Sequence, residues 1–254
     1  MSNFTGTTTT ELLKALEKME TAEVPLKGLI LDLRNNGGGL LNQSIKVADL
    51  FLDEGIILSI KGRNNKNTKV FNATHSSVER NYPMVVLING GSASASEIVA
   101  GALQDHKRAL ILGTTSFGKG SVQTVETLRD GSGLKLTIAR YYTPNDRSIQ
   151  AKGIEPDIYL KHRRLDPKET ARREEGLLKE KDLENHLEAE PTRETDPDDS
   201  ESKEEKEQKD KESRMRDAEM RIGPLTLEVL ESDNQVMRAL EMLEGYEIFK
   251  TLKG

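Results

Sequence analysis

Two runs of apolar residues, each followed closely by a glycine cluster, constrain the fold of this chain more than any other feature. The first run is Leu26–Leu33, with Gly37–Gly39 just beyond it. The second is Met84–Ile88, and Gly90 and Gly91 follow it at once. Nearly continuous apolar runs of this length are typical of strands buried on both faces of a sheet. Glycines at their ends allow the tight turns that lead from a strand into a helix.

Helical patterns follow both runs. Leu41–Phe51 has the apolar spacing of a helix, and Ala95–Asp105 reads as a helix of small residues. A third strand is expected at Arg108–Leu112. The order strand, helix, strand, helix, strand predicts an α/β fold, with a mostly parallel buried sheet and flanking helices.

Shorter strand candidates complete the predicted core. Ile56–Ile60 and Val70–Asn72 are separated by a polar turn. Val122–Leu128 and Leu134–Tyr142 flank the segment Arg129–Gly133, whose Asp-Gly pair is a hairpin signal. We therefore expect a β-hairpin extension beside the parallel sheet.

The composition changes beyond residue 160. We predict a folded core at 1–160, a charged helical extension at 161–187, an acidic disordered linker at 188–219 and a C-terminal helical appendage at 220–254. The linker holds 14 acidic and 7 basic side chains, a net charge of −7 against −6 for the whole chain. So few apolar groups cannot offset the entropy lost on ordering.

Several function classes find no support in the composition. The acidity lies in the linker and no basic patch is present, so we expect no nucleic-acid partner. The chain has no cysteine, which excludes disulfides and thiolate chemistry. No apolar stretch reaches the roughly 20 residues of a transmembrane helix, and the first residues do not form a signal peptide.

Without cysteine, a nucleophile for peptide hydrolysis must be a hydroxyl, and a base must accept its proton. None of the four histidines follows a buried strand, so a Ser-His-Asp triad has no obvious base. Lys119 lies between two glycines, with no acidic residue from Asp105 to Glu126. A lysine acts as a base only when desolvated. The alternative is a solvated surface lysine, the usual state of this residue type.

The nucleophile is less well defined by the residues alone. Ser92, Ser94 and Ser96 alternate between the second apolar run and the helix after it. Any of them could present a hydroxyl at the helix start, where N–H groups are free. The alternative for Ser94 is an ordinary helix cap, with Glu97 completing a capping box. Composition does not choose among the three serines.

Longer stretches of the sequence resemble a known family. Residues from about 4 to 160 resemble the core of the carboxyl-terminal processing, or tail-specific, protease family. The matching stretches are 28–39, 91–105, 117–123 and 130–158, in the order that the family has them. The resemblance implies a ClpP/crotonase-like α/β core, without the family's PDZ domain and export signal. We expect a fragment or a truncated gene product for that reason.

The resemblance also implies the site residues. The family's serine precedes its lysine by 25 residues, which selects Ser94 as nucleophile and Lys119 as base. A glutamine four positions later, Gln123, would orient the amine, and the two side chains share a face if the segment is a strand. The oxyanion donors correspond to the N–H groups of Ala95 and of a loop glycine, Gly38 in preference to Gly37.

Neighbouring polar residues have a structural interpretation. Asp32, Arg34 and Asn35 end the first strand, and we expect them to brace the glycine loop rather than take part in catalysis. Glu97 and Asp105 are expected to be structural as well.

The implied function is a serine endopeptidase that cuts protein substrates near apolar C-terminal tails through an acyl-enzyme. No cofactor or metal is expected, and the resemblance implies a periplasmic or exported location. The C-terminal helices could support a homo-oligomer or bind an adaptor. Two alternatives remain: a catalytically silent binding or scaffold module, and a crotonase-like acyl-CoA enzyme. The set Ser94, Lys119 and Gln123 argues against the second.

Overall fold

The computed structural model describes residues 1–24, 26–63, 68–74, 78, 80–164 and 226–252. The chain divides into two compact units. One consists of Met1–Arg163 with Asn234–Gly254, and the other of Arg164–Asp233. In the second unit the structure describes one short helix, α6 (Leu227–Glu231). The predicted linker at 188–219 and most of the charged extension at 161–187 lie outside the described residues.

The first unit is built on a parallel sheet. Its four strands are β1 (Leu29–Asp32), β4 (Met84–Ile88), β5 (Leu110–Gly113) and β8 (Ile158–Tyr159), in the spatial order β1-β4-β5-β8. Every neighbouring pair is parallel, so the carboxyl ends of the strands lie at one edge. The α/β fold with a parallel sheet and flanking helices, predicted from the sequence, is confirmed.

Both faces of this sheet are buried, as the unbroken apolar runs predicted. Alternate residues of β4 enter different clusters, because side chains along a strand alternate between faces. Met84, Val86 and Ile88 join the main core, whereas Val85 and Leu87 join a second cluster.

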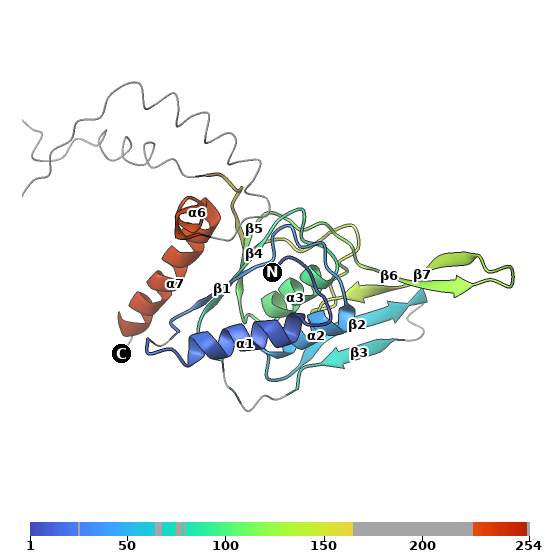
Figure 1. The fold of residues 1–254 in the computed structure, drawn as a ribbon, viewed down its shortest axis with the longest axis horizontal. Coiled ribbons are helices and arrows are strands. Elements are labelled where there is room, and N and C mark those ends of the chain that lie inside the picture. The colour runs from blue at the N-terminus through green and yellow to red at the C-terminus, as the bar shows by residue number, and fades with distance from the viewer. Residues whose placement is uncertain (25, 64–67, 75–77, 79, 165–225, 253–254) are drawn as a thin grey trace, which may run out of the picture. The chain divides into compact units, whose positions relative to one another are not determined.

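Helices cover the two faces (Figure 1). The main core contains side chains of α1 (Thr8–Glu20), α2 (Leu41–Asp49) and α3 (Ala95–Asp105). The second cluster contains side chains of α7 (Asn234–Leu252). A helical appendage was expected at 220–254, without a prediction of how many helices it holds. In the described part of this segment, α6 and α7 are separate helices, because the chain leaves the helical path at Ser232 and Asp233.

A second, antiparallel sheet lies beside the core. Its order is β3-β2-β7-β6, from β2 (Ile56–Gly62), β3 (Lys69–Asn72), β6 (Ser121–Thr127) and β7 (Gly133–Tyr142). Strands β6 and β7 form the long hairpin of Figure 1. β6 begins two residues after Lys119, so this sheet determines where the loop that carries Lys119 ends.

Candidate active site

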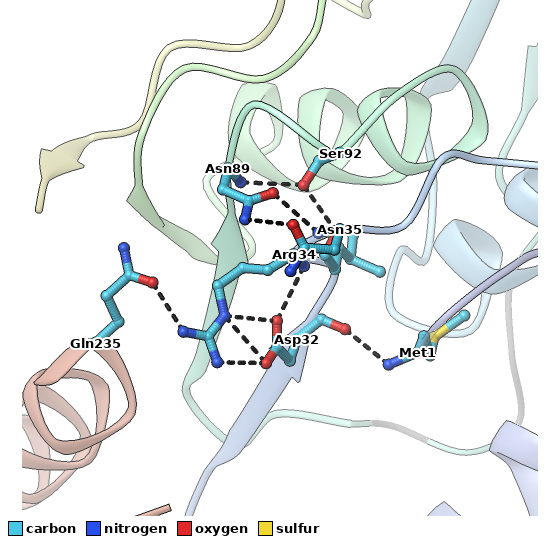
Figure 2. Close-up of polar contacts among 8 residues, drawn as sticks. Met1, Asp32, Arg34, Asn35, Asn89, Ser92 and Gln235 are labelled. Atoms are coloured by element: carbon cyan, nitrogen blue, oxygen red, sulfur yellow. Dashed lines mark hydrogen bonds and ion pairs between the residues drawn. The ribbon is translucent and has the colours of Figure 1, made fainter. Parts of the chain in front are cut away.

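The site lies at the carboxyl ends of β1 and β4, where two loops are joined by hydrogen bonds (Figure 2). The Asn89 side chain accepts the N–H of Asn35 at 2.9 Å and donates to its side-chain oxygen at 3.0 Å. The Asn36 carbonyl accepts the N–H of Ala93 at 2.9 Å. The glycine loop after β1 is thereby held against the turn that leads into α3.

The three candidate serines have different surroundings. Ser92 Oγ donates to the Leu33 carbonyl at 2.8 Å, and Ser96 Oγ donates to the Asn36 carbonyl at 2.9 Å. Both residues are fully buried. Ser94 is partly exposed. The hydroxyls of the other two therefore join the loops together, and Ser94 is the serine that a substrate could reach.

Ser94 has an unusual backbone conformation, with φ 55° and ψ −110°. A positive φ is costly for a residue with a side chain and persists only where neighbours enforce it. The Ser94 N–H donates to Glu97 Oε2 at 2.8 Å. Ala95 directly follows as the first residue of α3, where helix geometry leaves backbone N–H groups without intrahelical acceptors.

Glu97 connects the serine turn to the lysine loop. Its side chain is fully buried and accepts four hydrogen bonds. Besides the Ser94 N–H, it accepts Ser116 Oγ–H at 2.6 Å, the Gly118 N–H at 2.6 Å and the Lys119 N–H at 2.8 Å. A single carboxylate thus binds the backbone N–H groups of both predicted catalytic residues.

The side chains of Lys119 and Gln123 are both exposed. Among the described residues no hydrogen bond joins Lys119 to Ser94 or to Gln123, and Gln123 Nε2 lies 3.5 Å from Thr137 Oγ1. Lys119 is therefore not in the desolvated setting expected for a base. The strand alternation that would place Lys119 and Gln123 on one face does not apply, because Lys119 precedes β6. The pairing with β7 also shifts register between Val122 and Gln123, with the extra residue in β7.

The glycine loop approaches Ser94 closely at Gly38, where φ is 99°. A Cβ there would lie 2.9 Å from Ser94 Cβ and 3.0 Å from the Ala95 nitrogen. However, the Gly38 N–H donates to Asn36 Oδ1 at 2.9 Å. No acceptor binds the Gly37 N–H within the part of the chain that the structure describes. The Gly39 N–H likewise has no acceptor among the described residues, so the free donors in this loop include the N–H of Gly37, the second choice from the sequence.

Asp32, Arg34 and Asn35 brace the loop. Arg34 Nε lies 3.0 Å from Asp32 Oδ1, and Nη2 lies 2.6 Å from Oδ2, a bidentate ion pair. The Arg34 N–H also donates to Asp32 Oδ1 at 2.9 Å. Asp105 is paired with Arg147, away from these loops. These contacts agree with the structural roles expected for the residues.

Ionisable groups elsewhere do not form a second chemical centre among the described residues, where no His, Asp or Glu cluster suits a metal ion. Burial, together with a hydrogen bond to Glu20 at 3.0 Å, raises the pKa of Tyr82 to about 12. Tyr82 lies two residues before β4, at the end of the strand opposite to Ser94. No helix among the residues described is long and apolar enough to span a bilayer.

Sequence reasoning missed the central role of Glu97. The spacing of Ser94 and Glu97 revealed the capping box, but gave no signal for the loop 116–119, which lies about 20 residues further along. It also missed Gln235, whose side chain reaches Arg34 from α7.

Comparison with known proteins agrees with this site. The model of peptidase family S41 matches residues 1–160. A carboxy-terminal-processing protease of Bartonella bacilliformis is 52% identical over 160 residues, which are 62% of this chain and 37% of that protein. A chloroplastic C-terminal processing peptidase of Tetradesmus obliquus is 42% identical over 160 residues, 63% of this chain and 34% of that protein.

A solved structure gives the same result. The photosystem II D1 C-terminal processing protease superposes with a TM-score of 0.59 at 41% identity, covering 63% of this chain and 41% of that one. These similarities define a serine-type peptidase. The chain belongs to peptidase family S41, and the resemblance to carboxyl-terminal processing proteases is confirmed. It spans about a third of the length of the curated relatives that it matches.

Proposed function

We propose that this chain carries a serine–lysine peptidase site that hydrolyses protein substrates near their C-termini. The observation that carries the proposal is the Glu97 carboxylate, which binds the backbone N–H of Ser94 and of Lys119. It holds together two residues that lie 25 positions apart in the sequence. The names of the relatives, which describe C-terminal processing, support the substrate class.

The proposed reaction begins when the neutral amine of Lys119 takes the Ser94 proton, and Oγ attacks the scissile carbonyl carbon. The N–H groups of Ala95 and Gly37 then donate to the developing oxyanion, with Gly38 shaping the loop around it. The lysine ammonium returns its proton to the leaving amine as the C–N bond breaks. Water, deprotonated by the same lysine, hydrolyses the Ser94 ester and restores both residues.

Lys119 is exposed, and a base of this type requires desolvation. We propose that the bound substrate supplies it by covering the amine. Gln123 would then orient the amine once the substrate orders both side chains. A periplasmic or exported location and an apolar substrate tail remain predictions from the family resemblance, as do partners bound through the C-terminal helices.

The test compares digestion of unfolded casein by the wild-type chain, Ser94→Ala and Lys119→Ala. We expect activity in the wild type and its loss in both variants, with unchanged melting temperatures. Activity that persists in Ser94→Ala would refute the nucleophile. An inactive wild type would instead favour a binding or scaffold module.

A further inference from the structure

Helix α7 lies outside the stretch that matches the peptidase family, yet it packs on the core of the same unit. Ala239 is fully buried against the face of the parallel sheet formed by Val85, Leu87 and Leu112. The side chain of Leu243 approaches Gly28, where a Cβ would meet its methyl group at 3.0 Å. These apolar contacts explain why the helix docks, but they do not involve the catalytic loops.

The first turn of α7 is different, because its buried residues are polar. Asn234 is 7% exposed and Gln235 is fully buried. Asn234 Oδ1 accepts the Arg163 N–H at 2.7 Å, and its Nδ2 donates to the Lys161 carbonyl at 3.0 Å. Gln235 Nε2 donates to the Leu160 carbonyl at 2.5 Å. The start of the helix is thereby attached to the segment after β8.

The other end of the Gln235 amide points at the site. Its Oε1 accepts a hydrogen bond from Arg34 Nη1 at 2.8 Å (Figure 2). A buried amide is costly unless its polar atoms are paired, and an apolar side chain would serve docking equally well. The hydrogen bond to the Arg34 guanidinium therefore explains why a buried amide, and not an apolar side chain, stands at position 235.

Arg34 transmits this contact to the glycine loop. Its other nitrogens bind the Asp32 carboxylate, which also accepts the Arg34 backbone N–H. Two residues later, the Asn36 side chain orders Gly38 beside Ser94. The chain of contacts runs from α7, through an ion pair, to the loop that carries the proposed oxyanion donor.

Resting on the proposed function, we propose that Gln235 is a positioning residue, through which the C-terminal helix fixes the oxyanion loop by holding Arg34. Displacement of a catalytic group by about 1 Å can lower a rate about 100-fold. Loss of the Gln235 hydrogen bond should therefore lower kcat and leave KM nearly unchanged, because it moves groups that act in the transition state.

Three variants of the full chain test this. Gln235→Ala removes the acceptor for Arg34, and we expect kcat to fall at least about tenfold, with KM within about twofold. Gln235→Glu keeps an acceptor for Arg34 and should recover most of kcat. Leu243→Val loosens the packing of the same helix further along and should lower the melting temperature with little change in kcat.

A second measurement keeps the test independent of peptidase activity. Hydrogen exchange of the backbone amides of residues 34–40 should accelerate in Gln235→Ala but not in Leu243→Val. An inactive wild type with this exchange pattern would refute the proposed function while supporting the positioning role. The positioning role is overturned if Gln235→Ala keeps wild-type kcat and exchange. It is equally overturned if Gln235→Ala and Leu243→Val each lower kcat in proportion to their loss of stability.

Discussion

Replacing Glu97 by Gln should separate the two predicted catalytic residues without changing the volume of the core. The Glu97 carboxylate accepts two hydrogen bonds on each oxygen, from Ser116 and Gly118 on Oε1 and from Ser94 and Lys119 on Oε2. A Gln amide has one acceptor oxygen and one donor nitrogen. Whichever way the amide turns, two donors lose their acceptor and face an NH2 group instead.

The magnitude follows from the two hydrogen bonds that the substitution removes. A hydrogen bond to a charged group contributes about 1.5–3 kcal/mol, so the removal of two lowers the free energy of unfolding by about 3–6 kcal/mol. The whole stability of a domain is about 5–15 kcal/mol. At about 2–4 °C per kcal/mol for a domain of this size, the melting temperature should fall by at least about 6 °C.

The assay measures thermal unfolding by circular dichroism, and casein digestion at a temperature where the variant is still folded. The matched control is Asp157→Asn, because Asp157 also accepts bonds on both oxygens, from Ile111 N–H and Gln104 Nε2, away from the catalytic loops. We expect the control to lose stability and keep kcat, and Glu97→Gln to lose both. A Glu97→Gln protein with wild-type melting temperature and kcat would refute the central role of this carboxylate.

Three further predictions concern other positions. Gly38→Ala should reduce activity about 100-fold or more, because the new Cβ would lie 2.9 Å from Ser94 Cβ. Gly37→Ala is the control and should keep wild-type stability, because a Cβ at Gly37 would meet nothing within 4 Å. Equal effects in the two variants would contradict this geometry. Thr143→Val should raise the free energy of unfolding by about 1 kcal/mol, which chemical denaturation would measure. The reason is that the buried Thr143 hydroxyl has no hydrogen-bond partner in the described part of the chain. The pKa of Tyr82 is raised from 10.0 to about 12, so between these pH values the folded state retains a proton that the unfolded state loses. The free energy of unfolding should therefore decline as pH rises from 10.0 to about 12. This component of the decline should be missing in Tyr82→Phe.

The sequence was sufficient for the architecture around the site. Unbroken apolar runs predicted strands buried on both faces, and Val85 and Val86 indeed enter different clusters on opposite faces of the sheet. The glycine clusters marked the ends of these strands, where the loops of the site lie. Local periodicity carries this information because each residue's environment is set by its own strand or helix.

The finer geometry depends on interactions that no local pattern records. The register shift between Val122 and Gln123 leaves an extra residue in β7, and a shift of this kind depends on how the two strands pair. The choice of Gly37 over Gly38 as free donor depends on the side chain of Asn36. Amphipathic spacing likewise predicted a C-terminal helix, but could not predict that Gln235 would reach Arg34, about 200 residues earlier in the chain.

The two interpretations of Ser94, as helix cap and as nucleophile, are compatible. The Ser94 N–H and Glu97 Oε2 make one half of a capping box, a contact that stabilises many helix starts. Here the backbone of Ser94 has a positive φ, and the same carboxylate extends to Ser116, Gly118 and Lys119. A capping glutamate needs only one acceptor oxygen at the helix start, so the remaining hydrogen bonds of Glu97 serve the second loop. An ordinary local motif thus also connects the proposed nucleophile to the proposed base, which is why Ser94 and Glu97 fit both interpretations.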